Sequence, residues 1–306
     1  MFFSIMTSVI LPILLLVLIG AFLQKKFSMN LSHLSKLLTY CLMPAAVFLN
    51  LYLVELDAQL LTQMIVYLLL FFSLVTVMLS QLLSKLLHLK AGEKAALNNS
   101  ITLMNSGNYG LPVSQLVFSG QPIGITVQIF VLVFQNILTY SYGLYNLLAA
   151  SKSLLEILKA FIRMPVIYAV LLGLFLQYLN VTLPDFLMVP IEHLANGFVA
   201  LALLLLGAQL SAISIRYFHR VITWALLGRL IAVPVIAFLL ISILGISGVI
   251  AQSLFIASSF PTSRNTSSLA LEYNVEPELH AQIVLYSTLL SILTVTFTIY
   301  LSTILF

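Results

Sequence analysis

Apolar residues form long runs along this chain, and polar residues gather in short stretches between the runs. A helix needs about 20 apolar residues to cross the hydrocarbon core of a bilayer. Ten runs approach that length. We predict membrane-spanning helices at roughly 4–24, 34–54, 59–83, 93–117, 123–147, 158–179, 189–211, 220–243, 248–271 and 281–304.

The composition agrees with this pattern. Of the 306 residues, 61% are hydrophobic and only 7% are charged, and the mean hydropathy is +1.14. A water-soluble domain needs a wetted surface that this composition cannot supply. We therefore predict an all-α polytopic membrane protein whose formal net charge of +4 reflects membrane topology rather than nucleic-acid binding.

The loop charges predict the orientation. The loops after expected spans 2, 4, 6 and 8 and both termini contain no lysine or arginine, and acidic residues such as Glu55, Asp57 and Asp185 occur in the loops of this group. Basic residues mark cytoplasmic loops, so both termini should lie outside the cytoplasm. The loops after expected spans 1, 3, 5 and 7 hold the basic residues Lys25, Lys26, Lys36, Lys85, Lys90, Lys94, Lys152, Lys159, Arg163, Arg216 and Arg220.

The two halves of the chain resemble each other. At an offset of 153 residues, LPILLLVLIGAFLQ (11–24) aligns with MPVIYAVLLGLFLQ (164–177), and Gly20 aligns with Gly173. Because each half holds five expected spans, an odd number, the second half must be inserted upside down. The predicted fold is a 5+5 inverted repeat, with residues 1–150 as the first repeat and 151–306 as the second, which is a plan used by secondary transporters.

The fourth span of each half is interrupted by helix-breaking residues, NSGNYGLP (105–112) in one and FPTSRN (260–265) in the other. Freed backbone groups cannot face lipid, so both interruptions should face protein or a watery cavity and meet near the midplane. The alternative is a pair of packing kinks at Pro112 and Pro261. On the first interpretation the substrate site comprises Asn105, Gly107, Asn108, Gly110, Pro112, Pro261, Ser263, Arg264 and Asn265.

Arg264 indicates the charge of the substrate. A guanidinium at the bilayer centre costs at least ~2.5–3.5 kcal/mol and needs a partner. The acidic residues lie in loops or at span ends, so an anion from solution is a candidate partner. Snorkelling, or caging by carbonyls, Asn105 or Asn108, is the alternative. None of the acidic residues lies clearly at the bilayer midplane, which disfavours cation antiport. A sodium site built from neutral oxygen ligands is still an alternative.

Other polar or kinking residues within the spans are less specific. Arg229 is expected to snorkel to the headgroups rather than bind substrate. The candidates for lining a cavity are Pro44, Asn50, Asn136 and Gln209, although small and amide residues in membrane helices also serve packing and helix–helix hydrogen bonds. The single cysteine, Cys41, is expected to be a packing residue. The five histidines show no metal-ligand spacing, and no metal site is predicted.

Five motifs resemble the auxin efflux carrier (AEC) family of bacterial and plant transporters, which includes the plant PIN proteins. They are LMPAAVF (42–48), NSGNYGLPV (105–113), LALLLLGAQL (201–210), SFPTSRNTSSLALEYN (259–274) and STLLSILT (287–294). The resemblance covers nearly the whole chain. It implies crossed, proline-broken helices 4 and 9, a scaffold of helices 1, 2, 6 and 7, and a transport domain of helices 3–5 and 8–10.

The resemblance also implies an organic anion as cargo. The chain has only a short connection at 148–158, as bacterial members do, which favours the inner (plasma) membrane of a bacterium. Many relatives should have a small or neutral residue at the position of Arg264, so the cargo of any one relative cannot be transferred.

The predicted function is a secondary active transporter or uniporter of a small organic anion, a carboxylate, working by alternating access. The alternative is a membrane sensor that binds a ligand in the same pocket without net flux. No enzyme motif is visible in the spans. We expect no cofactor, with Na⁺ or H⁺ as candidate coupling ions. The expected partners are the anion and the lipid bilayer, with no nucleic acid and with a homodimer left open.

Overall fold

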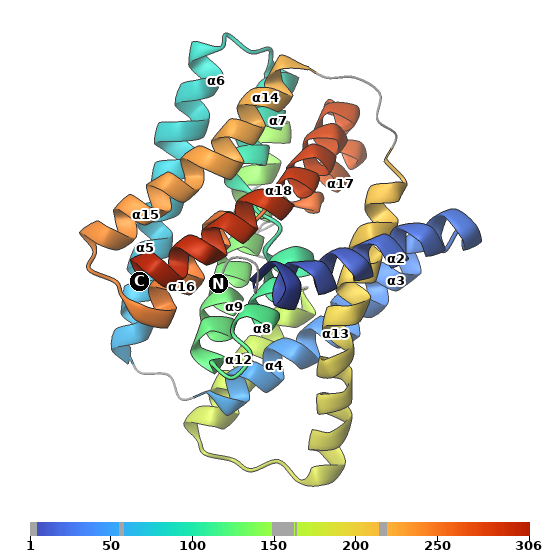
Figure 1. Cartoon of the computed structure of the whole chain (residues 1–306), viewed down its shortest axis with the longest axis vertical. Helices are drawn as coiled ribbons and strands as arrows, with labels where there is room; N and C mark the ends of the chain where they lie inside the picture. Colours follow the sequence, from blue (N-terminus) through green and yellow to red (C-terminus); the bar gives the residue numbers. More distant parts are fainter. Residues whose placement is uncertain (1–4, 55–57, 149–161, 163, 214–218) are drawn as a thin grey trace.

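The computed structural model of the chain is built from helices (Figure 1). It describes residues 5–54, 58–148, 162, 164–213 and 219–306. Within these ranges no β-strand occurs apart from one isolated bridge. Several loop charges used above lie outside the described residues, namely Glu55, Asp57, Lys152, Lys159, Arg163 and Arg216.

The helices follow the apolar runs. In the first half they are η1 (Met6–Ile10), α2 (Leu11–Phe27), α3 (Leu31–Leu37), η2 (Leu38–Leu42), α4 (Met43–Leu53), α5 (Ala58–Ser73), η3 (Leu74–Gln81), α6 (Leu82–Leu86), α7 (Ala91–Thr102), η4 (Ser106–Gly110), α8 (Leu111–Val117), α9 (Pro122–Leu138), η5 (Thr139–Gly143) and α10 (Leu144–Leu148). In the second half they are α12 (Pro165–Tyr178), α13 (Asp185–Ser211), α14 (Arg220–Leu227), η6 (Gly228–Ala232), α15 (Val233–Ile243), α16 (Gly248–Ser258), α17 (Arg264–Glu272) and α18 (Pro277–Leu305).

Seven continuous helices of the described residues are long and apolar enough to cross a membrane. The remaining three expected spans differ from that pattern. The described part of the sixth, α12, is 14 residues long, and the expected fourth and ninth spans are each split into two shorter helical pieces. The chain is therefore an all-helical integral membrane protein, and the ten-helix count stays a prediction.

Short π-helical segments (the η elements) precede prolines inside the helices. Four of them, η1, η2, η4 and η6, end two residues before Pro12, Pro44, Pro112 and Pro234 respectively. Proline lacks an N–H group, and its ring crowds the carbonyl one turn earlier. The wider π turn accommodates that loss without exposing the backbone to lipid.

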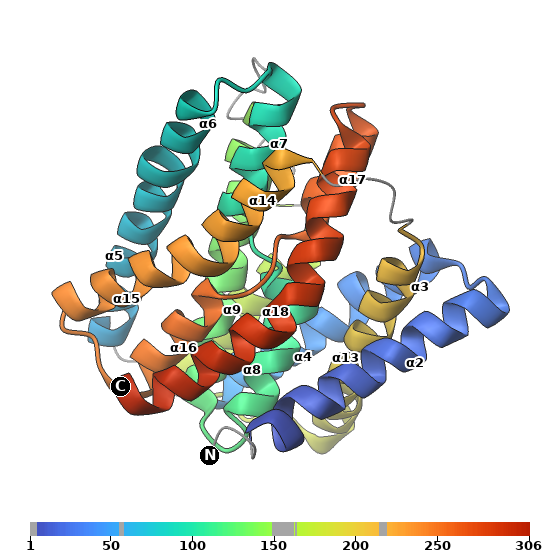
Figure 2. The same ribbon diagram turned by 45° about the horizontal axis from the view of Figure 1, so that its top comes forward.

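The helices form two groups. Helices η1, α2, α3, η2, α4, α12 and α13 make one group, and the other described helices make the second; Figure 2 shows α2, α3 and α13 of the first group to one side of α5, α6, α14 and α15. Glycines bring backbones into contact in the first group. A Cβ atom on Gly20 would lie 1.9 Å from the carbonyl oxygen of Leu204, and one on Gly207 would lie 1.8 Å from that of Val17. Close approach of this kind is typical of membrane helix pairs.

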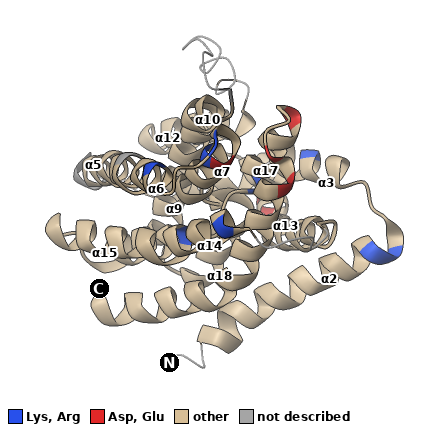
Figure 3. Ribbon diagram, turned by 90° about the horizontal axis from the view of Figure 1, so that it is seen from above, with Lys and Arg blue, Asp and Glu red and all other residues tan. Residues whose placement is uncertain are grey.

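The described basic loop residues, blue in Figure 3, lie at the end of α2, in α3, in α6, at the start of α7 and at the start of α14. Beside them Glu93 lies 3.4 Å from His219, and this pair joins the turn before α7 to the turn before α14. Gly92 lies against the side chain of Glu276, from the turn before α18. We call this set of helix ends the basic end, and its members are Lys25, Lys26, Lys36, Lys85, Lys90, Lys94 and Arg220.

Candidate functional site

The two interrupted helices meet where each loses its helical backbone. Residues 103–105 separate α7 from η4, and residues 259–263 separate α16 from α17. The amide N–H of Asn105 donates to the carbonyl of Pro261 at 2.8 Å, and that of Ser263 donates to the carbonyl of Leu103 at 2.8 Å. Met104 and Thr262 thus form an antiparallel bridge. The prediction that the two interruptions meet is confirmed.

The position of the first interruption differs from the prediction. Gly107, Gly110 and Pro112 lie inside the helical segment that resumes at Ser106, not in the unwound stretch. Proline is tolerated there because it follows a π-helical turn near the helix start. Gly110 serves close packing, since a Cβ atom on it would lie 2.6 Å from the ring of Phe260 across the crossing.

Side chains satisfy the backbone groups freed at the crossing. The Thr262 hydroxyl donates to the carbonyl of Ser100 in the last turn of α7, at 2.9 Å, and the Thr262 amide donates to the hydroxyl of Ser287 on α18, at 3.2 Å. Gln128 of α9 donates to the carbonyl of Ser106, at 2.8 Å. Each bond brings in a residue from another helix, so the unwound backbone is held by tertiary structure.

Arg229 contradicts the expectation that it snorkels to the headgroups. It is fully buried in η6, with an exposed fraction of 0%. Its Nη1 donates to the carbonyl of Ile101 at 2.8 Å, and its Nη2 donates to the carbonyl of Ser258. Both acceptors belong to the last turns of helices that stop at the crossing. The snorkelling prediction was wrong because the two acceptors are carbonyls of other helices, and nothing in the apolar sequence around Arg229 indicates them.

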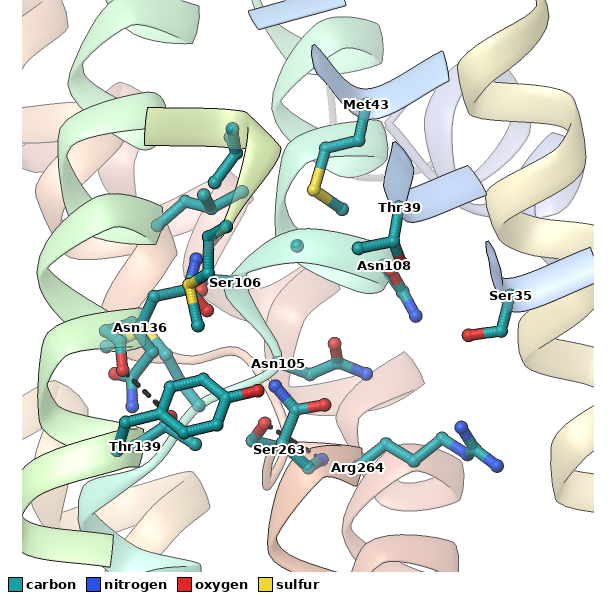
Figure 4. A pocket seen from close by; sticks show the side chains of 18 of the residues that line it. Ser35, Thr39, Met43, Asn105, Ser106, Asn108, Asn136, Thr139, Ser263 and Arg264 are labelled. Carbon is teal, nitrogen blue, oxygen red and sulfur yellow. Dashed lines mark hydrogen bonds between the residues drawn. The ribbon is translucent and has the colours of Figure 1, made fainter. Parts of the chain in front are cut away.

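A polar cavity of about 310 Å³ lies beside the crossing (Figure 4). Among the residues predicted for the site or for cavity lining, it brings together Asn105, Gly107, Asn108, Asn136, Ser263, Arg264 and Asn265. Its volume is near the lower end of the range for small-molecule pockets. Two buried side chains present unpaired amide atoms. Asn105 is 5% exposed and Gln135 is 2% exposed, and neither Asn105 Nδ2 nor the Gln135 amide has a partner among the described residues.

Arg264 begins α17, directly after Ser263, whose hydroxyl accepts from the Asn265 amide at 3.3 Å. Figure 4 shows the guanidinium extending from beside Ser263 toward the side of Ser35, away from Asn136. The side chain is half-buried, and within the described ranges no acidic residue lies at ion-pair distance from it. A second cavity of about 330 Å³ adjoins the first, shares Arg264, Ser35 and Thr39 with it, and adds Lys36 from the basic end.

Six predicted residues are absent from the lining of the polar cavity. Pro261 lies in the bridge itself. Asn50 donates to the carbonyl of Ala46 at 2.7 Å, one turn earlier in α4. Gln209 is buried within α13, 3% exposed. The others, Gly110, Pro112 and Pro44, lie in or next to π-helical turns, so local backbone geometry explains them.

The cavity also contains polar residues that the sequence interpretation missed. Ser35 and Thr39 come from the helix before α4, and Gln135 and Thr139 come from the end of α9 and the start of η5. Each pair is spaced by four residues and therefore lies on one helix face. Such a polar stripe in an otherwise apolar span was a usable signal. Tyr40 and Tyr140 complete the polar set.

A bundle of apolar helices with two interrupted helices crossing beside a polar cavity is the construction of a membrane transport protein. The family model described as "Membrane transport protein" matches residues 150–299. The chain is also 26% identical over 299 residues to an uncharacterized transporter of Methanocaldococcus jannaschii, with 94% of this chain and 96% of the relative covered. Both findings agree with the resemblance to the auxin efflux carrier family that the motifs carry.

Proposed function

We propose that this protein carries a small organic anion, a carboxylate, across the membrane by alternating access. The observation that carries the proposal is Arg264, which lines both the polar cavity and the adjoining one and has no acidic partner among the described residues. An arginine in the membrane interior needs a counter-charge. A carboxylate supplies it and accepts two parallel hydrogen bonds from the guanidinium plane.

The remaining lining suits the polar parts of such a ligand. Asn105 Nδ2 and the Gln135 amide offer unpaired hydrogen-bonding atoms, and Asn108 and Asn136 offer two further amides. Neutral amides hydrogen-bond a second oxygen function without adding charge. The proposed binding set is therefore Arg264 for charge, with these amides for orientation.

The proposed architecture is the 5+5 inverted repeat, and the packing supports it. In the first half α2 packs on α13, and in the second half the equivalent helix α12 packs on α4, the equivalent of α13. The aligned glycines make matching close approaches, Gly20 to Leu204 of α13 and Gly173 to the carbonyl of Phe48 in α4, at 3.1 Å. The crossing pairs residues 158 positions apart, Met104 with Thr262, close to the 153-residue offset.

The two helix groups are proposed to act as scaffold and transport domain. The scaffold comprises η1, α2, α3, η2, α4, α12 and α13, and the transport domain comprises the other described helices. The polar cavity lies between them, because Ser35, Thr39 and Met43 line it from one side and Asn105 and Arg264 from the other. A site at such a boundary can be exposed to either side of the membrane by moving one group against the other.

The cavity continues toward Lys36 at the basic end. With both termini outside the cytoplasm, that end is cytoplasmic, and we propose that the structure is inward-facing. Transport is driven by the gradient of the anion itself or by coupling to H⁺ or Na⁺.

Counterflow in proteoliposomes tests the proposal. Purified protein is first screened by thermal shift against mono- and dicarboxylic acids, and a stabilising acid is then used as labelled substrate. Uptake driven by unlabelled acid inside the vesicles is the expected result. Binding without counterflow would identify the sensor alternative, and stabilisation by neutral analogues alone would refute the anion assignment.

A further inference from the structure

Arg229 holds the ends of both interrupted helices, although those helices belong to different halves of the chain. Ile101 is next to last in α7, and Ser258 is the last residue of α16. One guanidinium donates to both of their carbonyls. The last carbonyls of a helix have no intrahelical partner, so Arg229 supplies hydrogen bonds that neither helix can make for itself.

The Arg229 guanidinium reaches these carbonyls because η6 and α7 pack closely together. Gly228 precedes Arg229, and a Cβ atom at Gly228 would lie 2.7 Å from the Ile101 side chain. A glycine at this position lets η6 approach α7 closely enough for the guanidinium to reach the Ile101 carbonyl. Pro234, which lacks an N–H group, follows two residues after η6, and the wider π-helical turn of η6 accommodates it.

The charges explain why a cation belongs at this position. A helix C-terminus carries the equivalent of about −0.5 elementary charge, so two converging C-termini approach one negative charge. Among the described residues no carboxylate forms an ion pair with Arg229; its ionisable neighbour is the phenol of Tyr67 on α5. The positive charge of Arg229 is therefore balanced by helix ends rather than by an acid.

In transporters built from broken helices, C-terminal ends and unwound carbonyls bind the coupling cation. We propose that the carbonyls of Ile101 and Ser258 form a monovalent-cation site that this chain fills with its own Arg229, so that the crossing requires no cation from solution. This inference goes beyond the proposed function and does not depend on the identity of the substrate. Removing the arginine should open the site to an external cation.

Thermal unfolding of purified Arg229→Ala, measured with increasing guanidinium chloride up to about 20 mM at constant ionic strength set by choline chloride, tests this directly. A ligand that binds only the folded protein stabilises it in a saturable way, so we expect a rise in unfolding temperature of several degrees. Unmodified protein and Arg220→Ala should show no such rise. Arg220 is exposed on α14, the helix that leads into η6, and provides the same loss of charge.

A second pair of variants covers the case in which Arg229→Ala does not fold. Arg229→Lys keeps a cation with hydrogen-bond donors, whereas Arg229→Gln keeps donors without charge. The lysine variant should unfold at the higher temperature. The inference is overturned if folded Arg229→Ala shows no saturable response to guanidinium, or if Arg229→Gln is as stable as Arg229→Lys, because the residue would then serve packing alone. Neither readout uses transport, so this result is separate from that of the counterflow assay.

Discussion

The charge of Arg264 provides the sharpest test of the anion site. Arg264→Gln keeps a similar length and hydrogen-bonding capacity but removes the positive charge. Because the guanidinium makes no ion pair with the described residues, a bound carboxylate would gain its bonds without displacing an internal acid. A hydrogen bond to a charged group contributes about 1.5–3 kcal/mol. At 1.4 kcal/mol for each factor of ten, Arg264→Gln should weaken binding by roughly tenfold to a hundredfold.

The assay is titration calorimetry with the carboxylic acid that most stabilises the unmodified protein. Arg264→Lys should recover little affinity, since an ammonium lacks the planar fork. Asn105→Ala removes a neutral partner and should cost about 1 kcal/mol. Arg220→Gln is the matched control, because it removes an exposed arginine at the basic end. Unchanged affinity in folded Arg264→Gln would refute the proposed role and leave the arginine a structural residue.

Three further outcomes are expected. Thr262→Val removes the buried hydroxyl that bonds the last turn of α7 and should lower the unfolding free energy by about 1–3 kcal/mol. Thr262→Ser keeps the hydroxyl and should retain most of this free energy. Equal stability of the two variants would contradict this role. Gly207→Ala would place a Cβ atom 1.8 Å from a carbonyl oxygen of α2 and should destabilise by ~1–3 kcal/mol, whereas Gly197→Ala in the same helix meets no atom within 4 Å and should unfold like the unmodified protein. For topology, a cysteine at Asp185 should react with an impermeant thiol reagent added outside cells and one at Lys90 should not; the reverse labelling pattern would reject the assigned orientation.

The sequence by itself determined the elements and the family resemblance. Apolar runs of sufficient length must be helical in a bilayer, because lipid offers no hydrogen bonds to the backbone, and seven such helices are present in the described residues. The helix-breaking residues that interrupt two of these apolar runs were also evident from the sequence, and they predicted which two segments meet at the crossing. The motifs around residues 105–113 and 259–274 carried the family resemblance because their order along the chain is itself sequence information.

Tertiary structure decided which groups are neighbours. The sequence could not show that Arg229 meets carbonyls 128 and 29 residues away, since carbonyl acceptors look alike at every residue. It also could not show that Thr39 and Gln135 share a cavity with Arg264, because that depends on how two helix groups pack. Gly107 and Gly110 were placed in the break from their low helix propensity, but the π-helical turn that contains both, together with the packing of Gly110 against Phe260, outweighed it. Propensity and hydropathy act locally, whereas the partners of buried polar groups are fixed by contacts between distant segments.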